Sequence, residues 1–174
     1  MKVVLFLGFS GSGKTWALTA IIRELTNQGF KVGTIKRIHE PNFSIDVKGK
    51  DTWRHASVGA STVLAVAPRE IDLIRRYADT STISTKEILS FFSHSKLDYL
   101  FVEGLHAKFE RLHGIKRIVC ARTQREATEL LKLHKGGILF ITGRFAEKTK
   151  RTEINSTPIL SLPRDNSRAV NLIK

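Results

Sequence analysis

Continuous apolar runs alternate with amphipathic stretches along the first part of the chain. Residues 2–7 (KVVLFL) form a β-branched-rich run, which is typical of a strand buried on both faces of a parallel sheet. From Lys14 to Gln28 apolar side chains recur at three- and four-residue spacing, which predicts an amphipathic helix that ends before Gly29. Residues 31–37 predict a second strand. The order strand, loop, helix, strand indicates an α/β protein.

A different pattern follows in the middle of the chain. A short helix is expected over residues 51–59, and two strands are expected over residues 61–68 and 69–77. The two strands are joined by a turn at Pro68 and Arg69, so they predict a β-hairpin inserted into the fold.

The alternation of strands and helices resumes after residue 83. Three further apolar runs predict strands, at 98–104, 116–121 and 136–142. Two helices are predicted to start at capping boxes and to end near His94 and His134; the boxes are Ser84 with Glu87 and Thr123 with Glu126. Because helices separate these strands, we expect right-handed crossovers and a mostly parallel sheet flanked by helices.

Composition limits the class of protein. The chain has 174 residues, of which 41% are hydrophobic, so we expect a single domain over residues 1–174. Its apolar runs are strand-sized, and the start MKVVLFLG leads directly into a glycine-rich motif, so neither a membrane span nor a signal peptide is expected. We therefore expect a cytoplasmic protein. The lone Cys120 has no partner for a disulfide or a zinc site and is expected in the core.

The charge balance favours anionic partners. The chain has 29 Lys or Arg and 16 Asp or Glu, a net charge of +13. Such a balance attracts nucleotides, phosphorylated ligands or nucleic acid. The basic residues are scattered, and no nucleic-acid-binding signature accompanies them. A nucleic-acid role is therefore not expected.

The segment GFSGSGKT, residues 8–15, matches the Walker A phosphate-loop pattern G-x-x-x-x-G-K-[ST]. It lies between a predicted buried strand and a predicted helix, as this motif requires. Its backbone is expected to bind phosphates through Gly8, Ser10, Gly11, Ser12 and Gly13. Lys14 is expected to reach the β- and γ-phosphates, and Thr15 to bind Mg²⁺. The sequence thus predicts an α/β, three-layer P-loop NTPase fold with a hairpin insertion.

An acidic residue at the end of a neighbouring strand usually completes such a site. Glu103 ends the strand DYLFVE and is expected at the same sheet edge as the phosphate loop, where it would hold Mg²⁺ or orient water. Asp98, at the opposite end of this strand, is expected to have only a structural role.

The polar loop over residues 39–50 follows the second strand toward the same edge. Within it Asp46 is the best candidate for a contact to Mg²⁺ or to the attacking water. Lys36, just before the loop, is a candidate for binding further anionic groups. With Lys14 and Glu103, Asp46 completes the set of candidate catalytic residues.

The sequence does not determine which nucleotide base the site binds. Guanine-specific GTPases carry an N-K-x-D motif after a later strand, and the corresponding segment here, GRFAEK at residues 143–148, has no Asn-Lys pair.

Four segments occur in order at short intervals: GFSGSGKT, GTIKRIHEPNFSID, GKDTWRHASVGA and LDYLFVEGLH. With them, residues 2–107 resemble the family of molybdopterin-guanine dinucleotide biosynthesis protein B (MobB), P-loop proteins that assist in making the molybdenum cofactor. The resemblance implies GTP binding, weak GTP hydrolysis, Mg²⁺, and a homodimer. It also implies cooperation with the MobA-type guanylyltransferase that attaches GMP to molybdopterin, with molybdopterin itself a further candidate ligand.

The resemblance also transfers to individual residues. Gly8, Gly13, Lys14 and Thr15 match the phosphate and Mg²⁺ positions; Asp46 and Asp51 match the acidic positions of the signature loop; Glu103 matches the V-E-G acid. The chain departs from the family where a Lys-His pair usually follows the second strand. It has Lys36 and Arg37 there, with His39 the one histidine before Pro41.

Three functions remain open at this point. The first is a slow Mg²⁺-dependent GTPase, and the second is an adaptor that presents GTP or molybdopterin to a transferase without catalysis of its own. The third is a small-molecule kinase or another NTPase of the same fold. A hydrolysis rate that rises sharply with the partner separates the first from the second, and a specific acceptor hydroxyl identifies the third.

Overall fold

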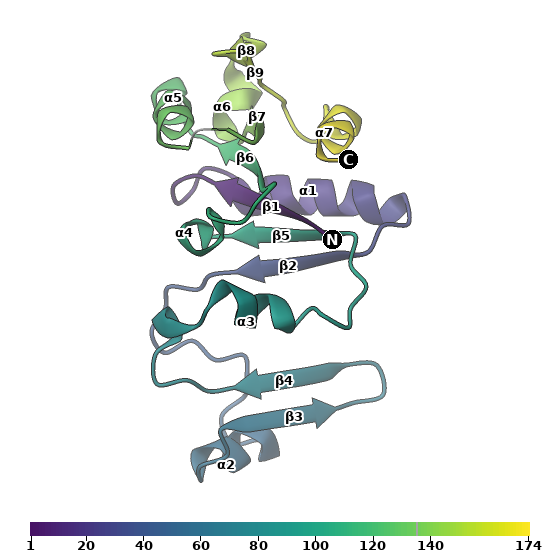
Figure 1. Cartoon of the computed structure of the whole chain (residues 1–174), viewed down its shortest axis with the longest axis vertical. Coiled ribbons are helices and arrows are strands. Elements are labelled where there is room, and N and C mark those ends of the chain that lie inside the picture. The colour runs from purple at the N-terminus through teal and green to yellow at the C-terminus, as the bar shows by residue number, and fades with distance from the viewer. Residues whose placement is uncertain (135) are drawn as a thin grey trace. The chain divides into compact units, whose positions relative to one another are not determined.

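A computed structural model describes residues 1–134 and 136–174 and divides the chain into two compact units (Figure 1). The first, called here the main unit, comprises Met1–Arg37 and Thr85–Lys174. The second, called the insert, comprises Ile38–Ser84. Each unit is described separately, and the single domain expected over residues 1–174 stays a prediction.

The main unit is built on a five-stranded sheet in the order β2-β5-β1-β6-β7. Its strands are β1 (Lys2–Leu7), β2 (Val32–Lys36), β5 (Tyr99–Glu103), β6 (Lys116–Cys120) and β7 (Ile138–Thr142). All four pairings in this sheet are parallel, and the arrowheads of β1, β2 and β5 point the same way in Figure 1. The predicted parallel sheet is therefore confirmed, with strand bounds within two residues of those expected.

Helices lie between these strands and after the last of them. They are α1 (Lys14–Asn27), α3 (Thr85–Ser90), α4 (His106–Phe109), α5 (Gln124–Leu133), α6 (Arg144–Lys148) and α7 (Asn166–Ile173). Two short strands, β8 (Glu153–Ile154) and β9 (Thr157–Pro158), pair with each other. The predicted helix after Ser84 ends at Ser90, before the expected His94, and residues 91–94 continue as a turn.

The central strand β1 is buried on both of its faces. Val4 and Phe6 pack into a core with α1 and α7, to which Ile21 and Val170 contribute. Leu5 points to the opposite face and is also fully buried. This double burial explains the apolar run over residues 4–7, because these four positions are shielded from water, whereas Lys2 at the start of the strand is exposed.

The start of α5 confirms half of its predicted capping box. The hydroxyl of Thr123 accepts a hydrogen bond from the Glu126 N–H at 3.2 Å. The Glu126 carboxylate, however, accepts from the backbone N–H of Arg122 at 2.9 Å and pairs with the Arg122 guanidinium. The side-chain hydrogen bond between the two residues lowers the pKa of Glu126 and raises the pKa of Arg122.

The insert contains a helix and a hairpin. Its elements are α2 (Asp51–Ser57), β3 (Thr62–Val66), β4 (Ile71–Arg75) and a 3₁₀ turn, η1 (Thr80–Thr82). β3 and β4 are antiparallel and form a sheet of their own, and Ala67 N–H donates to the Glu70 carbonyl across the turn at 2.8 Å. The predicted hairpin is confirmed.

Cys120 lies in the core at the end of β6, as expected, and is fully buried. Burial raises the pKa of its thiol to about 12, because the protein interior disfavours the thiolate. Throughout residues 1–134 and 136–174, no helix combines the length and apolar character that crossing a membrane requires.

Candidate functional site

The turn from β1 into α1 depends on glycine. Gly8, Gly11 and Gly13 have φ values of 149°, 71° and 92°, a region that residues with a side chain rarely adopt. A Cβ atom on Gly8 would lie 2.3 Å from the Cys120 carbonyl oxygen, whereas a Cβ on Gly11 would meet nothing within 4 Å. The loop is therefore pressed against the end of β6 at Gly8 and open at Gly11.

The first turn of α1 offers free backbone donors. Gly13 is the N-cap residue, no side chain caps the helix, and the first turn carries no acidic residue. A 14-residue helix with uncapped N–H groups attracts an anion through those donors and its dipole. Ser10 and Gly11 are exposed beside it, while Ser12 is buried, and within the described chain its hydroxyl has no hydrogen-bond partner. The Ser12 N–H donates to the Phe9 carbonyl oxygen at 3.3 Å, and its part in phosphate binding stays a prediction.

Lys14 folds back onto its own loop. Its ammonium group donates to the carbonyl oxygens of Gly8 at 2.9 Å and Phe9 at 2.7 Å. These bonds hold a positive charge beside the loop backbone, where a phosphate on the loop N–H groups would meet it.

A buried carboxylate lies next to the loop. The side chain of Glu103, at the end of β5, is only 7% exposed. Thr15 Oγ1 donates to both of its oxygens, at 3.1 and 3.2 Å, and Lys36 Nζ donates to Oε1 at 2.7 Å. The Lys36 ammonium also lies 3.4 Å from Thr15 Oγ1. The desolvated charge of Glu103 is therefore paired and hydrogen-bonded, as a buried ion must be.

Strand register brings this cluster together. In the parallel ladder Glu103 lies opposite Phe6 of β1 on one side and opposite Lys36 of β2 on the other. Thr15 is supplied by α1, which follows β1 directly. The expectation that Glu103 and the phosphate loop share one sheet edge is a consequence of parallel pairing, and the structure shows them in contact.

The cluster fits a hard cation. The Thr15 hydroxyl and the Glu103 carboxylate supply oxygen ligands, which Mg²⁺ prefers, and Mg²⁺ commonly takes only one or two protein ligands beside phosphates and water. Across the described residues no group of three or more His, Cys, Asp or Glu side chains is arranged to hold a metal. The donor set therefore suits a nucleotide-borne Mg²⁺ better than a permanently held metal.

Asp46 lies in the insert, and both of its oxygens are engaged there. Thr52 Oγ1 donates to Oδ1 at 2.8 Å, and the Arg76 guanidinium donates to Oδ2 at 3.1 Å. Its side chain is 2% exposed. The carboxylate thus ties the loop to α2 and to the end of the hairpin, and its expected role toward Mg²⁺ or water stays a prediction. Asp51 is 88% exposed and lies 3.7 Å from the Arg54 guanidinium; its binding role also stays a prediction.

Asp98 has the structural role that its position predicts. Its carboxylate accepts a hydrogen bond from the Lys31 N–H at 2.8 Å, at the edge of the sheet opposite to Glu103.

One part of the loop environment had no clear signal in the sequence. Gly143, after β7, packs against the phosphate loop: a Cβ on Gly143 would lie 2.3 Å from the Ser12 carbonyl oxygen. The next residue, Arg144, donates its N–H to the same oxygen at 3.4 Å. A lone glycine after an apolar strand does not reveal such a contact. The sequence indicates this contact only through the position of the segment, because it follows a later strand of a parallel sheet and so reaches the same edge as the loop.

The net charge belongs to one unit. The insert has six Lys or Arg and six Asp or Glu, so the remaining 23 basic and 10 acidic residues, and with them the whole net charge of +13, belong to the main unit. The unit that carries the phosphate loop therefore attracts anions, and the insert has no net charge.

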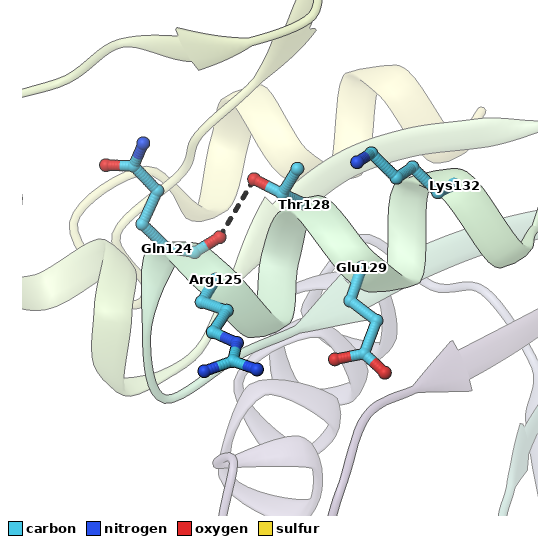
Figure 2. Close-up of a pocket in the computed structure, with 5 residues that line it drawn as sticks. All are labelled: Gln124, Arg125, Thr128, Glu129 and Lys132. Atoms are coloured by element: carbon cyan, nitrogen blue, oxygen red, sulfur yellow. Dashed lines mark hydrogen bonds between the residues drawn. The ribbon is translucent and has the colours of Figure 1, made fainter.

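Away from the phosphate loop, a pocket of about 530 Å³ lies along the outer face of α5 (Figure 2). Its lining residues are Gln124, Arg125, Thr128, Glu129 and Lys132. The Thr128 hydroxyl bonds back to the Gln124 carbonyl oxygen within the helix, at 3.0 Å. The pocket is lined from a single helix with charges of both signs, and we assign it no ligand.

Together, these features define the class of protein. A parallel sheet whose central strand leads through G-x-x-x-x-G-K-T into a helix, with an acid at the end of the neighbouring strand, is a P-loop NTPase fold. The family model described as molybdopterin guanine dinucleotide synthesis protein B (MobB) matches residues 3–142. The chain belongs to the MobB family.

Curated relatives carry related names. The chain is 29% identical over 104 residues to the molybdopterin-guanine dinucleotide biosynthesis adapter protein of Escherichia coli, covering 60% of this chain and 59% of the relative. It is 32% identical over 97 residues to the protein of the same name from Haemophilus influenzae, covering 56% of this chain and 53% of the relative. The chain thus spans little more than half the length of these relatives.

Solved structures share the fold. The crystal structure of Bacillus subtilis MobB superposes with a TM-score of 0.72 at 23% identity, covering 99% of this chain and 96% of that one. The MobB homologue from Bacillus stearothermophilus gives a TM-score of 0.69 at 19% identity, covering 99% and 98%. The architecture is therefore that of MobB proteins over almost the whole chain.

The contact of Gly143 with the phosphate loop predicts a large loss of stability for Gly143→Ala. Both glycines have positive φ, 90° at Gly143 and 84° at Gly29, and Gly143 combines it with a ψ of −167°, so an alanine at either costs about 1–3 kcal/mol of backbone strain. Only at Gly143 does the new methyl group meet backbone, so we expect an additional loss of about 1–3 kcal/mol. Urea unfolding of the two variants measures the difference, and equal losses would show that the turn after β7 does not press on the loop.

Proposed function

We propose that the protein binds GTP with Mg²⁺, hydrolyses it slowly, and assists the synthesis of molybdopterin-guanine dinucleotide. The observation that carries this proposal is the contact of Thr15 and Lys36 with the buried Glu103 carboxylate beside a free phosphate loop. Membership of the MobB family supports the pathway, and the basic main unit supports an anionic ligand.

Each residue of the site has a proposed role. The loop N–H groups of Gly8 to Gly13 bind the phosphates, and Lys14 exchanges its two carbonyl acceptors for phosphate oxygens. The Thr15 hydroxyl and Glu103 hold the Mg²⁺ that the nucleotide brings, directly or through water. Lys36, whose side chain is 53% exposed, neutralises Glu103 and also binds a terminal phosphate.

Hydrolysis by this arrangement is slow. A water molecule attacks only when a group orients it, and Glu103 is the acid of the main unit at this position. Its carboxylate is already held by Thr15 and Lys36 and is also proposed to hold Mg²⁺, so it is not dedicated to orienting water. Asp46 and Asp51, the acids of the insert that match the family's signature loop, are the other proposed contacts to water or Mg²⁺.

This commitment of Glu103 also favours a second candidate function, a non-catalytic adaptor that binds GTP or molybdopterin and presents it to a guanylyltransferase of the MobA type. The relatives from E. coli and H. influenzae are named adapter proteins. The two functions share the nucleotide site and differ in whether the partner raises the hydrolysis rate. Either role places the protein in the cytoplasm, where GTP is available.

We further propose a homodimer formed through the hairpin of the insert. One face of the hairpin carries four exposed aliphatic side chains, paired across the strands: Leu64 with Leu73, and Val66 with Ile71. Val66 is 72% exposed and Ile71 67% exposed. A second copy of this face is of matching apolar character, and a twofold axis lets each hairpin cover the other.

Lys14→Ala is expected to weaken binding of Mg²⁺-GTP by about a hundredfold or more, because charge-assisted bonds to phosphate are lost. The fold is expected to persist, since the bonds of Lys14 lie within its own loop. Trp16 is half-exposed one residue after Thr15, so its fluorescence in a Trp53→Phe background reports binding. Lys132→Ala, which removes a distant lysine, is the control. Unchanged affinity in Lys14→Ala, or loss of its circular dichroism signal, would contradict this account.

Glu103→Gln is expected to lower the hydrolysis rate by about a hundredfold and GTP affinity by less than about tenfold. Glutamine keeps an oxygen acceptor for Thr15 while it removes the charge that pairs with Lys36. Single-turnover hydrolysis and equilibrium binding separate the two effects, with Asp98→Asn as the control at the other end of β5. Equal and complete loss of both would show that Glu103 only supports the loop.

Val66→Asp is expected to convert the dimer to a monomer, because it places a charge in the apolar face. Val58→Asp is the matched control: Val58 is 86% exposed, just after α2 and outside the hairpin. Light scattering of the wild type and both variants gives the molar mass. A monomeric wild type, or a Val66→Asp protein that stays dimeric, would refute the interface.

A further inference from the structure

The carboxyl ends of β6 and β7 form the part of the sheet edge that lies across β1 from Glu103. In the strand order β2-β5-β1-β6-β7, the Thr15, Glu103 and Lys36 cluster occupies the β5 and β2 side. A nucleoside triphosphate is a chain of base, ribose and α-, β- and γ-phosphates, and its Mg²⁺ binds at the β- and γ-phosphate end. When those phosphates lie toward Glu103, the α-phosphate and the nucleoside extend the other way, over the ends of β6 and β7.

The turn after β7 is packed directly against the phosphate loop on that side. A Cβ on Gly13 would lie 3.4 Å from the Gly143 Cα atom, and the Arg144 N–H donates to the Ser12 carbonyl oxygen at 3.4 Å. These contacts hold the backbone of Arg144 next to the loop, on the side of the sheet formed by β6 and β7.

Two arginines follow the strand ends at this side, and only one is free. Arg122, after β6, donates from Nε to Glu126 Oε1 at 2.7 Å and is committed to that carboxylate. Arg144, after β7, is exposed, and over residues 1–134 and 136–174 its guanidinium has no hydrogen bond or ion pair. Of these two arginines, Arg144 is therefore the one that is available to a ligand.

We propose that Arg144 contacts the base of the bound nucleotide and selects guanine. This inference rests on the proposed nucleotide site. A guanidinium presents parallel N–H donors that match the O6 and N7 acceptors of guanine, whereas adenine presents an amino group in place of O6. The segment GRFAEK stands after the strand where guanine-specific GTPases carry their base-reading motif, and here a basic residue, Arg144, has its backbone next to the loop.

The test compares ligands that share phosphates and differ in the base. Binding of GTP, ATP and inorganic triphosphate, each with Mg²⁺, is measured by calorimetry on the full chain. Arg144→Ala is expected to lose about tenfold in GTP affinity, to lose its preference for GTP over ATP, and to bind inorganic triphosphate as the wild type does. Arg144→Lys keeps the charge without the fork, so it is expected to lose the preference as well.

Lys148→Ala is the matched control, because it removes an exposed cation one helical turn along α6 and is expected to change nothing. Wild-type affinity for GTP in Arg144→Ala would overturn the proposal. A loss of inorganic triphosphate binding equal to that of GTP, or a guanine preference retained by Arg144→Lys, would also overturn it, because Arg144 would then bind phosphate. A wild type that binds inorganic triphosphate but prefers no base refutes the base contact alone, whereas one that binds none of the three ligands refutes the nucleotide site as well.

Discussion

The buried carboxylate of Glu103 is the constraint around which the site is organised. A charge removed from water costs several kcal/mol unless partners compensate it, and here the compensation comes from Thr15 and Lys36. The three residues come from the end of β5, the first turn of α1 and the end of β2, so pairing one charge fixes three neighbouring segments. The same requirement places a hydroxyl, a carboxylate and an ammonium group beside the phosphate loop, where they could bind the phosphates and Mg²⁺ of the proposed ligand.

The loop itself is shaped by lack of space on one side. Gly8 cannot carry a side chain because the Cys120 carbonyl oxygen occupies that position, and Gly143 cannot because the Ser12 carbonyl oxygen does. The loop is thus held on one side by the ends of β6 and β7, while Gly11 stays open. This rigid support and the N–H groups at the start of α1 make a preorganised anion site, and the positive charge of the main unit adds long-range attraction.

Much of this could be predicted from the sequence, for a physical reason in each case. The apolar run of β1 and the spacing of apolar residues in α1 are local patterns, and parallel pairing then determines that Glu103 and the loop share an edge. The hairpin was predictable because strand and turn residues lie close together in the chain. The Glu126 carboxylate does not make the expected capping bond to the Thr123 N–H. It binds the N–H and the guanidinium of Arg122 instead, because an ion pair competes with a neutral donor. The contact of Gly143 with Ser12 joins residues more than a hundred positions apart, and no local pattern encodes it. The same holds for the bonds of Asp46, which depend on where Thr52 and Arg76 lie in the folded insert.

The central claim is that the Thr15 and Glu103 pair completes a phosphate loop that binds GTP together with Mg²⁺. Calorimetric titration of GTP into the wild-type protein, once with Mg²⁺ and once with EDTA, tests it most directly. The account predicts saturable binding that is at least about tenfold tighter with Mg²⁺, because the hydroxyl and carboxylate oxygens gain a cation that links them to the phosphates. Equal affinity under both conditions, or no binding in either, would contradict it.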